Sequence, residues 1–101
     1  MKVSSEARSR SIGAKFRLGT LVATPGALDA APSREALMDL VQRHSSGDWG
    51  DLDAHDQREN EIAVIRGGLR ILSAYELEGT RFWVITEADR SATTILLPDE
   101  Y

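Results

Sequence analysis

The chain has 101 residues and a formal net charge of −4, and 42% of its residues are hydrophobic against 28% that are charged. These values are typical of one soluble globular domain and argue against a disordered chain. The absence of cysteine excludes disulfides, thiolate metal ligands and a thiol nucleophile. No apolar run approaches the roughly 18 residues of a membrane helix, and no hydrophobic stretch of a secretory signal follows the basic N-terminus. We therefore expect a cytoplasmic protein without membrane association.

Charge is distributed unevenly along the chain. Residues 1–17 carry five basic residues against one acidic residue, whereas residues 18–101 carry seven Arg against fifteen acidic residues. Residues 1–15 contain few apolar side chains, which predicts a disordered basic arm before a single domain over residues 16–101. Direct nucleic-acid binding is expected only through this arm, because the acidic body suits a basic protein partner better than a phosphate backbone.

The domain is predicted to begin with a strand and a short helix. Residues 18–24 (LGTLVAT) form a short β-branched run that ends at Pro25-Gly26, which predicts a strand. Thr24 followed by Pro25 is a typical N-cap and first helical position, and it predicts a helix over residues 25–30.

Two longer helices are predicted next. Ser33 can cap the first, whose apolar face repeats with a period of 3.6 residues until Gly47 ends it. Asp53 can cap the second, over residues 53–66, before Gly67-Gly68. The expected inward positions are Leu37, Leu40, Val41 and His44 in the first helix, and Ala54, Ile62, Ile65 and Leu69 in the second.

The last third of the chain predicts three antiparallel strands. Residues 69–77 and 81–88 flank the tight turn Glu78-Gly79, so paired positions should sum to 157. This register places Glu76 opposite Arg81 and Tyr75 beside Phe82. A third strand is expected over residues 93–97, ending at Pro98. The predicted fold class is α+β: a short N-terminal strand, two to three helices, then a three-stranded antiparallel β-meander.

Several stretches resemble a family of small bacterial proteins that look like plasmid or mobile-element cargo. The matching stretches are LVATPGAL (21–28), RHSSGDWGDLD (43–53), RILSAY (70–75) and WVITEADRSATTILLPDEY (83–101). Some members carry a label that relates them to type I restriction-modification subunits. The present chain has neither the Gly-rich cofactor loop nor the catalytic tetrapeptide of such methyltransferases, and it is far too short for such a subunit. The resemblance therefore implies a mobile-element context and no verified activity.

The acidic stretch SGDWGDLDAHD (46–56) is the first candidate site, and it has two functional interpretations. A partner-binding surface could be formed by four of its residues, Asp48, Trp49, Asp51 and Asp53. Alternatively, His44, Asp48, Asp51 and Asp53 could bind Mg²⁺, Mn²⁺ or Zn²⁺ and activate water for phosphoester hydrolysis. A purely structural interpretation remains open, in which Asp53 caps a helix, Asp48 and Asp51 bond turn N–H groups, and Trp49 fills the core.

The turn at residues 87–91 is the second candidate site. Asp89 and Arg90 could bind a carboxylate, a phosphate or a partner, because loops held by a sheet often carry function. The leading hypothesis is a small non-catalytic accessory protein without a cofactor, which binds an unidentified protein partner through both turns. One version is inhibition of a host-defence nuclease by a surface that mimics DNA. The alternatives are the metal-dependent hydrolase and a homodimeric structural module.

Overall fold

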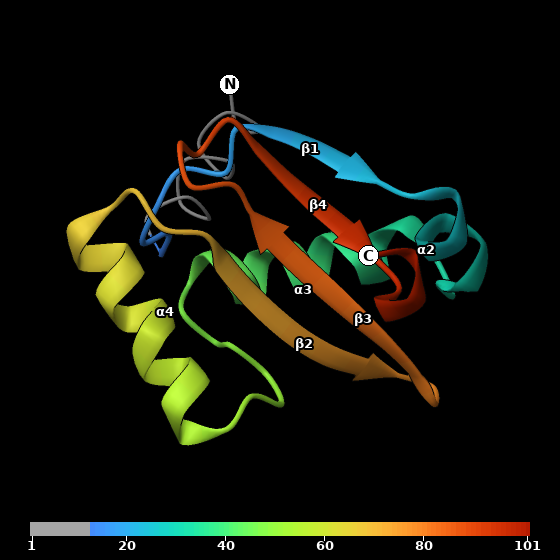
Figure 1. Ribbon diagram of the computed structural model, residues 1–101. Helices are drawn as coiled ribbons and strands as arrows, with labels where there is room; N and C mark the ends of the chain where they lie inside the picture. The colour runs from blue at the N-terminus through green and yellow to red at the C-terminus, as the bar shows by residue number, and fades with distance from the viewer. Residues whose placement is uncertain (1–12) are drawn as a thin grey trace.

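The computed structural model describes residues 13–101, and it has an α+β fold with one mixed four-stranded sheet (Figure 1). The elements in chain order are β1 (Thr20–Ala23), α2 (Pro25–Ala30), α3 (Arg34–Ser45), α4 (Ala54–Arg66), β2 (Ile71–Leu77), β3 (Thr80–Thr86), β4 (Ala92–Leu96) and the 3₁₀ turn η1 (Pro98–Glu100). Residues 1–12 of the predicted basic arm lie outside the described residues. In the described part of that arm, the N–H of Lys15 donates to the carbonyl of Ser45 at 2.7 Å. No helix within residues 13–101 combines the length and apolarity needed to cross a membrane.

The sheet corrects the prediction of a three-stranded meander. Strands β2, β3 and β4 form the expected antiparallel meander, but β1 joins them and gives the order β1-β4-β3-β2. β1 runs parallel to β4, with Thr20 opposite Ala92. The N–H groups of Thr20 and Thr24 donate to the carbonyls of Ser91 and Ile95, both at 3.0 Å. Pairing between segments so far apart in the chain leaves no local sequence pattern, and for that reason it escaped prediction.

The β2–β3 hairpin has the predicted register. Every paired position sums to 157, with Glu76 opposite Arg81 and Tyr75 opposite Phe82. Glu78 and Gly79 connect the strands with φ values of 48° and 83°. Two consecutive positive φ angles match the right-handed twist of a tight hairpin.

Helix α3 covers one face of the sheet (Figure 1), and the main apolar core lies between them. Its N-terminus is capped as predicted, because the N–H of Ala36 donates to Ser33 Oγ at 3.1 Å. Leu37, Leu40 and Val41 of α3 enter this core as predicted, together with Ala27 of α2 and residues from β2, β3 and β4. Its buried members are Ala27, Leu37, Leu40, Val41, Tyr75, Phe82, Val84 and Ile95.

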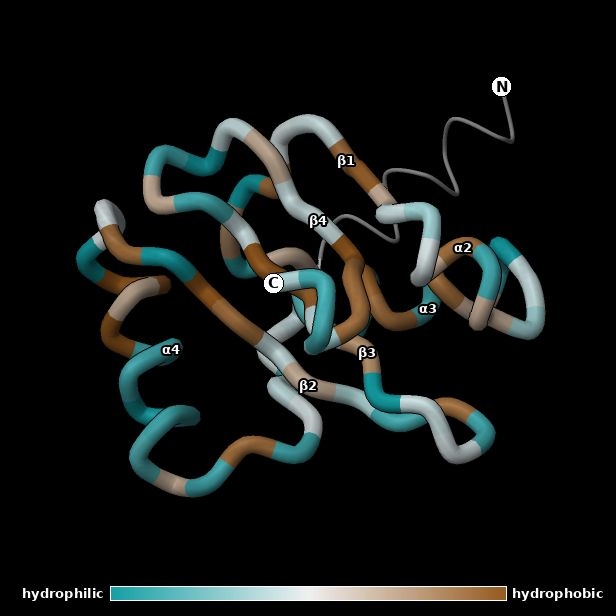
Figure 2. Tube along the Cα trace, turned by 45° about the vertical axis from the view of Figure 1, so that its right-hand side comes forward, coloured by the Kyte–Doolittle hydropathy of each residue, from teal (hydrophilic) through white to brown (hydrophobic). Residues whose placement is uncertain are grey.

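Helix α4 is largely hydrophilic (Figure 2), and its predicted apolar face is wrong. Ile65 is 82% exposed and Ala54 is also exposed. The buried residues of α4 are instead Asn60 and Ala63. The reason is that α4 contacts the edge strand β2, where it meets backbone as well as side chains. The side chain of Asn60 donates to the carbonyl of Leu72 at 2.7 Å and accepts from its N–H at 3.3 Å.

The loop between α3 and α4 covers the same outer edge of β2. The N–H of Asp51 donates to the carbonyl of Ala74 at 2.7 Å, and the N–H of Ala74 donates to the carbonyl of Trp49 at 3.2 Å. Gly50 lies between these two bonds with φ 74°, and a Cβ there would lie 1.9 Å from the carbonyl oxygen of Ala74. The acidic loop therefore adds a short parallel bridge to the sheet, and only glycine fits at its centre.

This close approach predicts that Gly50→Ala lowers the free energy of unfolding by at least about 2 kcal/mol, because left-handed strain adds to a backbone clash. Gly68→Ala is the matched control, since Gly68 has a similar φ of 77° and open space around it. The control should cost about 1 kcal/mol. Urea denaturation of both variants measures the difference, and equal losses would contradict the role of the bridge.

Candidate functional site

The acidic loop begins at Asp48, which is tied to α3 and β2. Its carboxylate accepts from Arg43 Nε at 2.6 Å and from the N–H of Gly50 at 3.2 Å. Its carbonyl accepts from the Tyr75 hydroxyl at 2.5 Å. The hydrogen bond from Arg43 is the main cause of the lowered pKa of Asp48. Asp48 is thus committed to contacts within the chain.

Trp49 is buried, although we predicted it as part of a partner-binding surface. It packs with Ala63 and Ile71 in a second apolar cluster, next to Phe16. Its Nε1–H donates to Glu61 Oε2 at 2.8 Å, which satisfies the polar atom of the ring. Trp49 therefore anchors the loop in the core.

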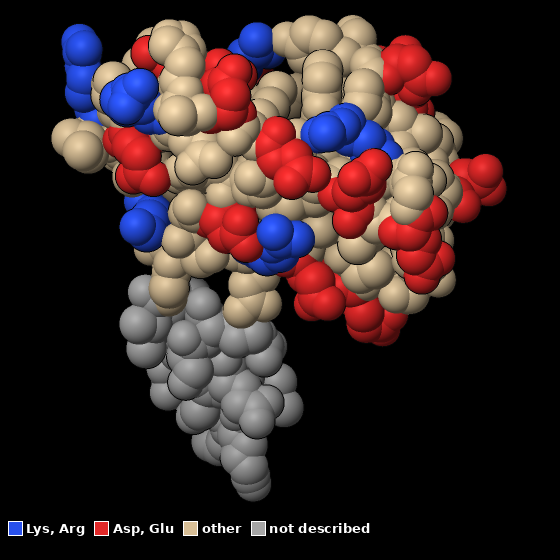
Figure 3. All heavy atoms as spheres, turned by 90° about the horizontal axis from the view of Figure 1, so that it is seen from below, with Lys and Arg blue, Asp and Glu red and all other residues tan. Residues whose placement is uncertain are grey.

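The remaining carboxylates of this region point to solvent. Asp53 caps α4 as predicted, because it accepts from the N–H of Asp56 at 2.8 Å. The Asp51 carboxylate has its nearest cation in Arg81, at 4.0 Å. We define the acidic face as the exposed residues Asp51, Asp53, Asp56 and Glu59. The view in Figure 3 shows acidic side chains spread over this side of the molecule, interrupted by isolated basic ones.

His44 lies at the centre of a buried hydrogen-bond chain. Its Nδ1 is 2.6 Å from Ser73 Oγ and its Nε2 is 2.9 Å from Thr86 Oγ1. Thr86 is bonded to Thr93 at 2.7 Å, and Thr93 donates to the carbonyl of Leu18 at 2.8 Å. Each hydroxyl has one proton, so the direction of every bond follows from the carbonyl acceptor at the end.

That direction assigns the tautomer of His44. Thr93 donates its hydroxyl hydrogen to the carbonyl of Leu18. Thr86 must therefore donate to Thr93 and accept from His44. The imidazole therefore carries its proton on Nε2 and accepts from Ser73 at Nδ1. Burial, aided by the positive charge of Arg90, lowers the pKa of His44 from 6.5 to about 3. The ring is a neutral core residue with both nitrogens occupied.

The four proposed metal ligands are not gathered into one site. Both nitrogens of His44 are used in the core, and Asp48 is paired with Arg43. Among the described residues, the one group of three potential ligand atoms within 4.8 Å of one another belongs to Asp53, His55 and Asp56. These side chains are exposed, and exposed carboxylates are common without a bound ion.

Arg90 in the second candidate turn makes structural contacts. Its guanidinium donates to the carbonyl of Ala63 at 2.9 Å and to the carbonyl of Leu69 at 2.7 Å. It also donates to the carbonyls of Glu87 and Ala88 in its own turn, both at 3.1 Å. Arg90 therefore satisfies carbonyl groups at and beyond the C-terminal end of α4.

Asp89 stabilises the same turn by accepting from the N–H of Ser91 at 2.9 Å, and its hydrogen bonds with Ser91 lower its pKa. Asp53 begins α4, whereas Arg90 binds carbonyls at its other end. The two candidate turns thus lie at opposite ends of this helix, and they do not form the joint surface that we predicted.

Three structural roles escaped the sequence analysis. Glu61 pairs with the indole of Trp49, Asn60 binds the edge of β2, and Tyr75 binds the acidic loop. Asn60 lies outside the predicted apolar face of α4, so the hydrophobic period did not indicate that this helix meets backbone. Nothing local indicated the partners of Glu61 or Tyr75, because those contacts join separate elements.

The buried His44 predicts a specific dependence of stability on pH. The unfolded state gains a proton below pH 6.5 that the folded state refuses down to about pH 3. The contribution of neutral His44 to the free energy of unfolding is therefore fully present above pH 6.5. Below that pH it falls by about 1.4 kcal/mol per pH unit. His44→Gln should show a loss between pH 7 and pH 5 that is smaller by about 2 kcal/mol. Denaturation at both pH values measures this, and a wild-type pH dependence in His44→Gln would contradict the assignment to His44.

Substitution by Ala should lower stability more at Asp48 than at Asp51. Asp48→Ala removes an acceptor for Arg43 and Gly50 and should cost about 1 kcal/mol of stability. Asp51→Ala removes an exposed carboxylate without a close partner and should change stability by less than about 0.5 kcal/mol. Thermal denaturation compares the two, and an equal loss at Asp51 would restore its structural interpretation.

Comparisons with known proteins add no relative to these observations. No family model matches the chain, and neither a curated protein nor a solved structure matches it significantly. The resemblance to mobile-element proteins accordingly stays a prediction, and the functional proposal rests on the residues of this chain.

Proposed function

We propose that this protein is a small, non-catalytic binding module whose acidic face recognises a basic surface of a partner protein. The observation that carries the proposal is that the backbone of the acidic loop is held in place while acidic side chains of the loop and of the first turns of α4 stay exposed. The loop's backbone and Trp49 are held by the sheet and core, while the side chains of Asp51, Asp53, Asp56 and Glu59 remain exposed. A fixed backbone presents these carboxylates at little cost in ordering on binding.

The charge on this part of the chain favours a basic partner. Residues 48–61 contain six acidic residues and one Arg. Grouped charges of one sign accelerate association with a surface of opposite charge and repel acidic surfaces. Nucleic acid is thereby disfavoured on this face.

The contacts of the other predicted site residues suit a supporting role. Asp48 and Trp49 hold the loop in position, and Arg90 holds the distant end of α4 with Asp89 beside it. In the version suggested by the sequence resemblance, the partner is a host-defence nuclease whose basic DNA-binding surface accepts the acidic face. Host-defence nucleases are therefore one class of partner to be tested.

The metal-dependent hydrolase is the competing hypothesis, and calorimetry separates it from the binding module. Titration of chelator-treated protein with Mn²⁺, Zn²⁺ and Ca²⁺ should release no heat of stoichiometric binding. Micromolar binding that Asp51→Ala abolishes, in a variant that remains folded, would replace the present proposal by the hydrolase.

The direct test removes charge from the acidic face without changing its shape. The triple variant Asp51→Asn, Asp56→Asn, Glu59→Gln keeps the Asp53 cap and the loop contacts. Tagged wild-type protein should retain a basic partner from an extract of the native host, and the triple variant should retain at least about tenfold less. The loss of several charge pairs worth a few tenths to one kcal/mol each gives this factor.

A matched control removes the same number of charges elsewhere. Glu76→Gln, Glu78→Gln and Asp99→Asn neutralise exposed carboxylates of β2, the β2–β3 turn and η1. This control should retain the partner as well as the wild-type protein does. Equal retention by all three proteins would refute the acidic face as the binding surface.

A further inference from the structure

The two outer edges of the sheet differ in how they are covered. On β2, the outward N–H and carbonyl of Leu72 are bonded to Asn60, and those of Ala74 are bonded to the acidic loop. The other edge is β1, whose one partner among the described strands is β4. An edge strand with free backbone groups is a template for pairing with another strand.

The backbone of β1 has two residues whose polar groups point away from the sheet. In a parallel ladder, alternate residues bond to the neighbouring strand. Thr20 and Thr24 bond to β4, so Val22 points the same way and Leu21 and Ala23 direct their N–H and carbonyl groups outward. β1 is short, with four residues, but none of these residues is charged and the strand contains neither proline nor a bulge, so three of the features that commonly protect an edge strand are missing.

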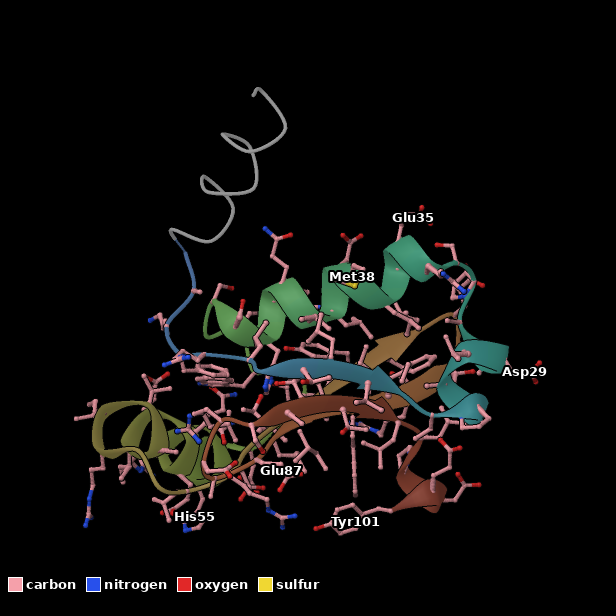
Figure 4. All side chains as sticks on the ribbon, turned by 90° about the horizontal axis from the view of Figure 1, so that it is seen from above. Asp29, Glu35, Met38, His55, Glu87 and Tyr101 are labelled. Carbon is pink, nitrogen blue, oxygen red and sulfur yellow. The ribbon has the colours of Figure 1, made fainter. Side chains whose placement is uncertain are left out.

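An apolar groove runs beside this edge, between β1 and α3. Two adjoining hollows of about 620 and 250 Å³ share Leu21, Arg34 and Met38 in their linings. Leu21 and Val22 are 42% and 44% exposed, and Leu28 and Met38 are each 50% exposed. Figure 4 looks onto this side of the molecule, where β1 runs in front of β4 and Met38 lies on α3. Four of the seven large apolar side chains exposed in residues 13–101 therefore gather at the open edge.

The distribution of charge indicates which partner fits. Residues 18–28 contain no charged side chain, and the groove is bordered by both signs, with Arg34 close to Glu35 and Asp39. Two copies of an acidic protein repel each other at the acidic face, but they meet without like-charge repulsion at this edge. A two-fold axis also requires a surface that complements itself, which an uncharged strand paired antiparallel with its copy provides.

We infer that two copies of this chain associate through their β1 strands, which pair antiparallel about a two-fold axis and join the two four-stranded sheets. With the axis at Val22, Leu21 of one copy exchanges backbone hydrogen bonds with Ala23 of the other. The grooves of the two copies then meet, and Leu21 and Met38 are buried against the second copy. The interface is distinct from the acidic face, so its failure would leave the proposed function standing.

The mass of the protein in solution tests the pairing. Sedimentation across a dilution series should show a species of twice 11.1 kDa that dissociates at low concentration. Leu21→Lys places a charge on the open edge and should yield the monomer throughout the series. Ile65→Lys, at an exposed site on α4, should remain dimeric. A wild-type monomer at every concentration, or a dimer that Leu21→Lys leaves intact, overturns the inference. A wild-type monomer would leave the edge for an extended segment of another protein.

A cysteine test gives a second readout without breaking the strand. The chain has no cysteine, so a single introduced thiol reports on one position. Val22→Cys would place two thiols opposite each other in a non-hydrogen-bonded pair, where Cα atoms lie about 4.5 Å apart and a disulfide can form. Under mild oxidation it should form a covalent dimer, whereas Glu78→Cys at the β2–β3 turn should not. Equal cross-linking at both positions, or none at Val22→Cys, counts against the two-fold pairing.

Discussion

The buried imidazole of His44 is the interaction on which the rest of the structure depends. Its hydrogen bonds join α3 to β2 and β3, and the chain continues through Thr93 to the segment before β1. Each polar group in this chain needs its neighbour, because a buried donor or acceptor without a partner costs about 1–3 kcal/mol. The elements are therefore fixed relative to one another by direction as well as by apolar contact.

The acidic loop binds the sheet through its backbone and exposes carboxylates to solvent. Its backbone closes the outer edge of β2, and Trp49 fills the space between α4 and Phe16. The loop needs a glycine at its centre and a large ring beside it for this packing. Two of its exposed carboxylates have structural roles, since Asp48 binds Arg43 and Gly50 and Asp53 caps α4, whereas Asp51 has no close partner. A fixed backbone that carries exposed carboxylates is what makes this loop a candidate for recognition.

Much of this architecture could be predicted from the sequence wherever local chemistry determines it. The caps at Thr24, Ser33 and Asp53, the buried face of α3 and the register around Glu78-Gly79 all follow from residues close together in the chain. Pairing of β1 with β4 could not be predicted, because no short-range pattern encodes a parallel neighbour. The inward face of α4 was missed because Asn60 binds backbone, which hydrophobic periodicity does not register. Arg90 was assigned to recognition for a related reason, since its carbonyl partners belong to other elements.

The parallel pairing of β1 has a consequence for how the chain acquires its structure. The β2–β3 and β3–β4 connections are short, and such local pairs close quickly. β1 meets β4 only after the intervening helices and strands have been spanned, which carries a larger entropic cost of loop closure. We expect β1 to dock late on a meander that is already formed. Until then the outer edge of β4 is as open as that of β1, so newly made chains pass through a stage in which a strand from a neighbouring molecule competes for the same place.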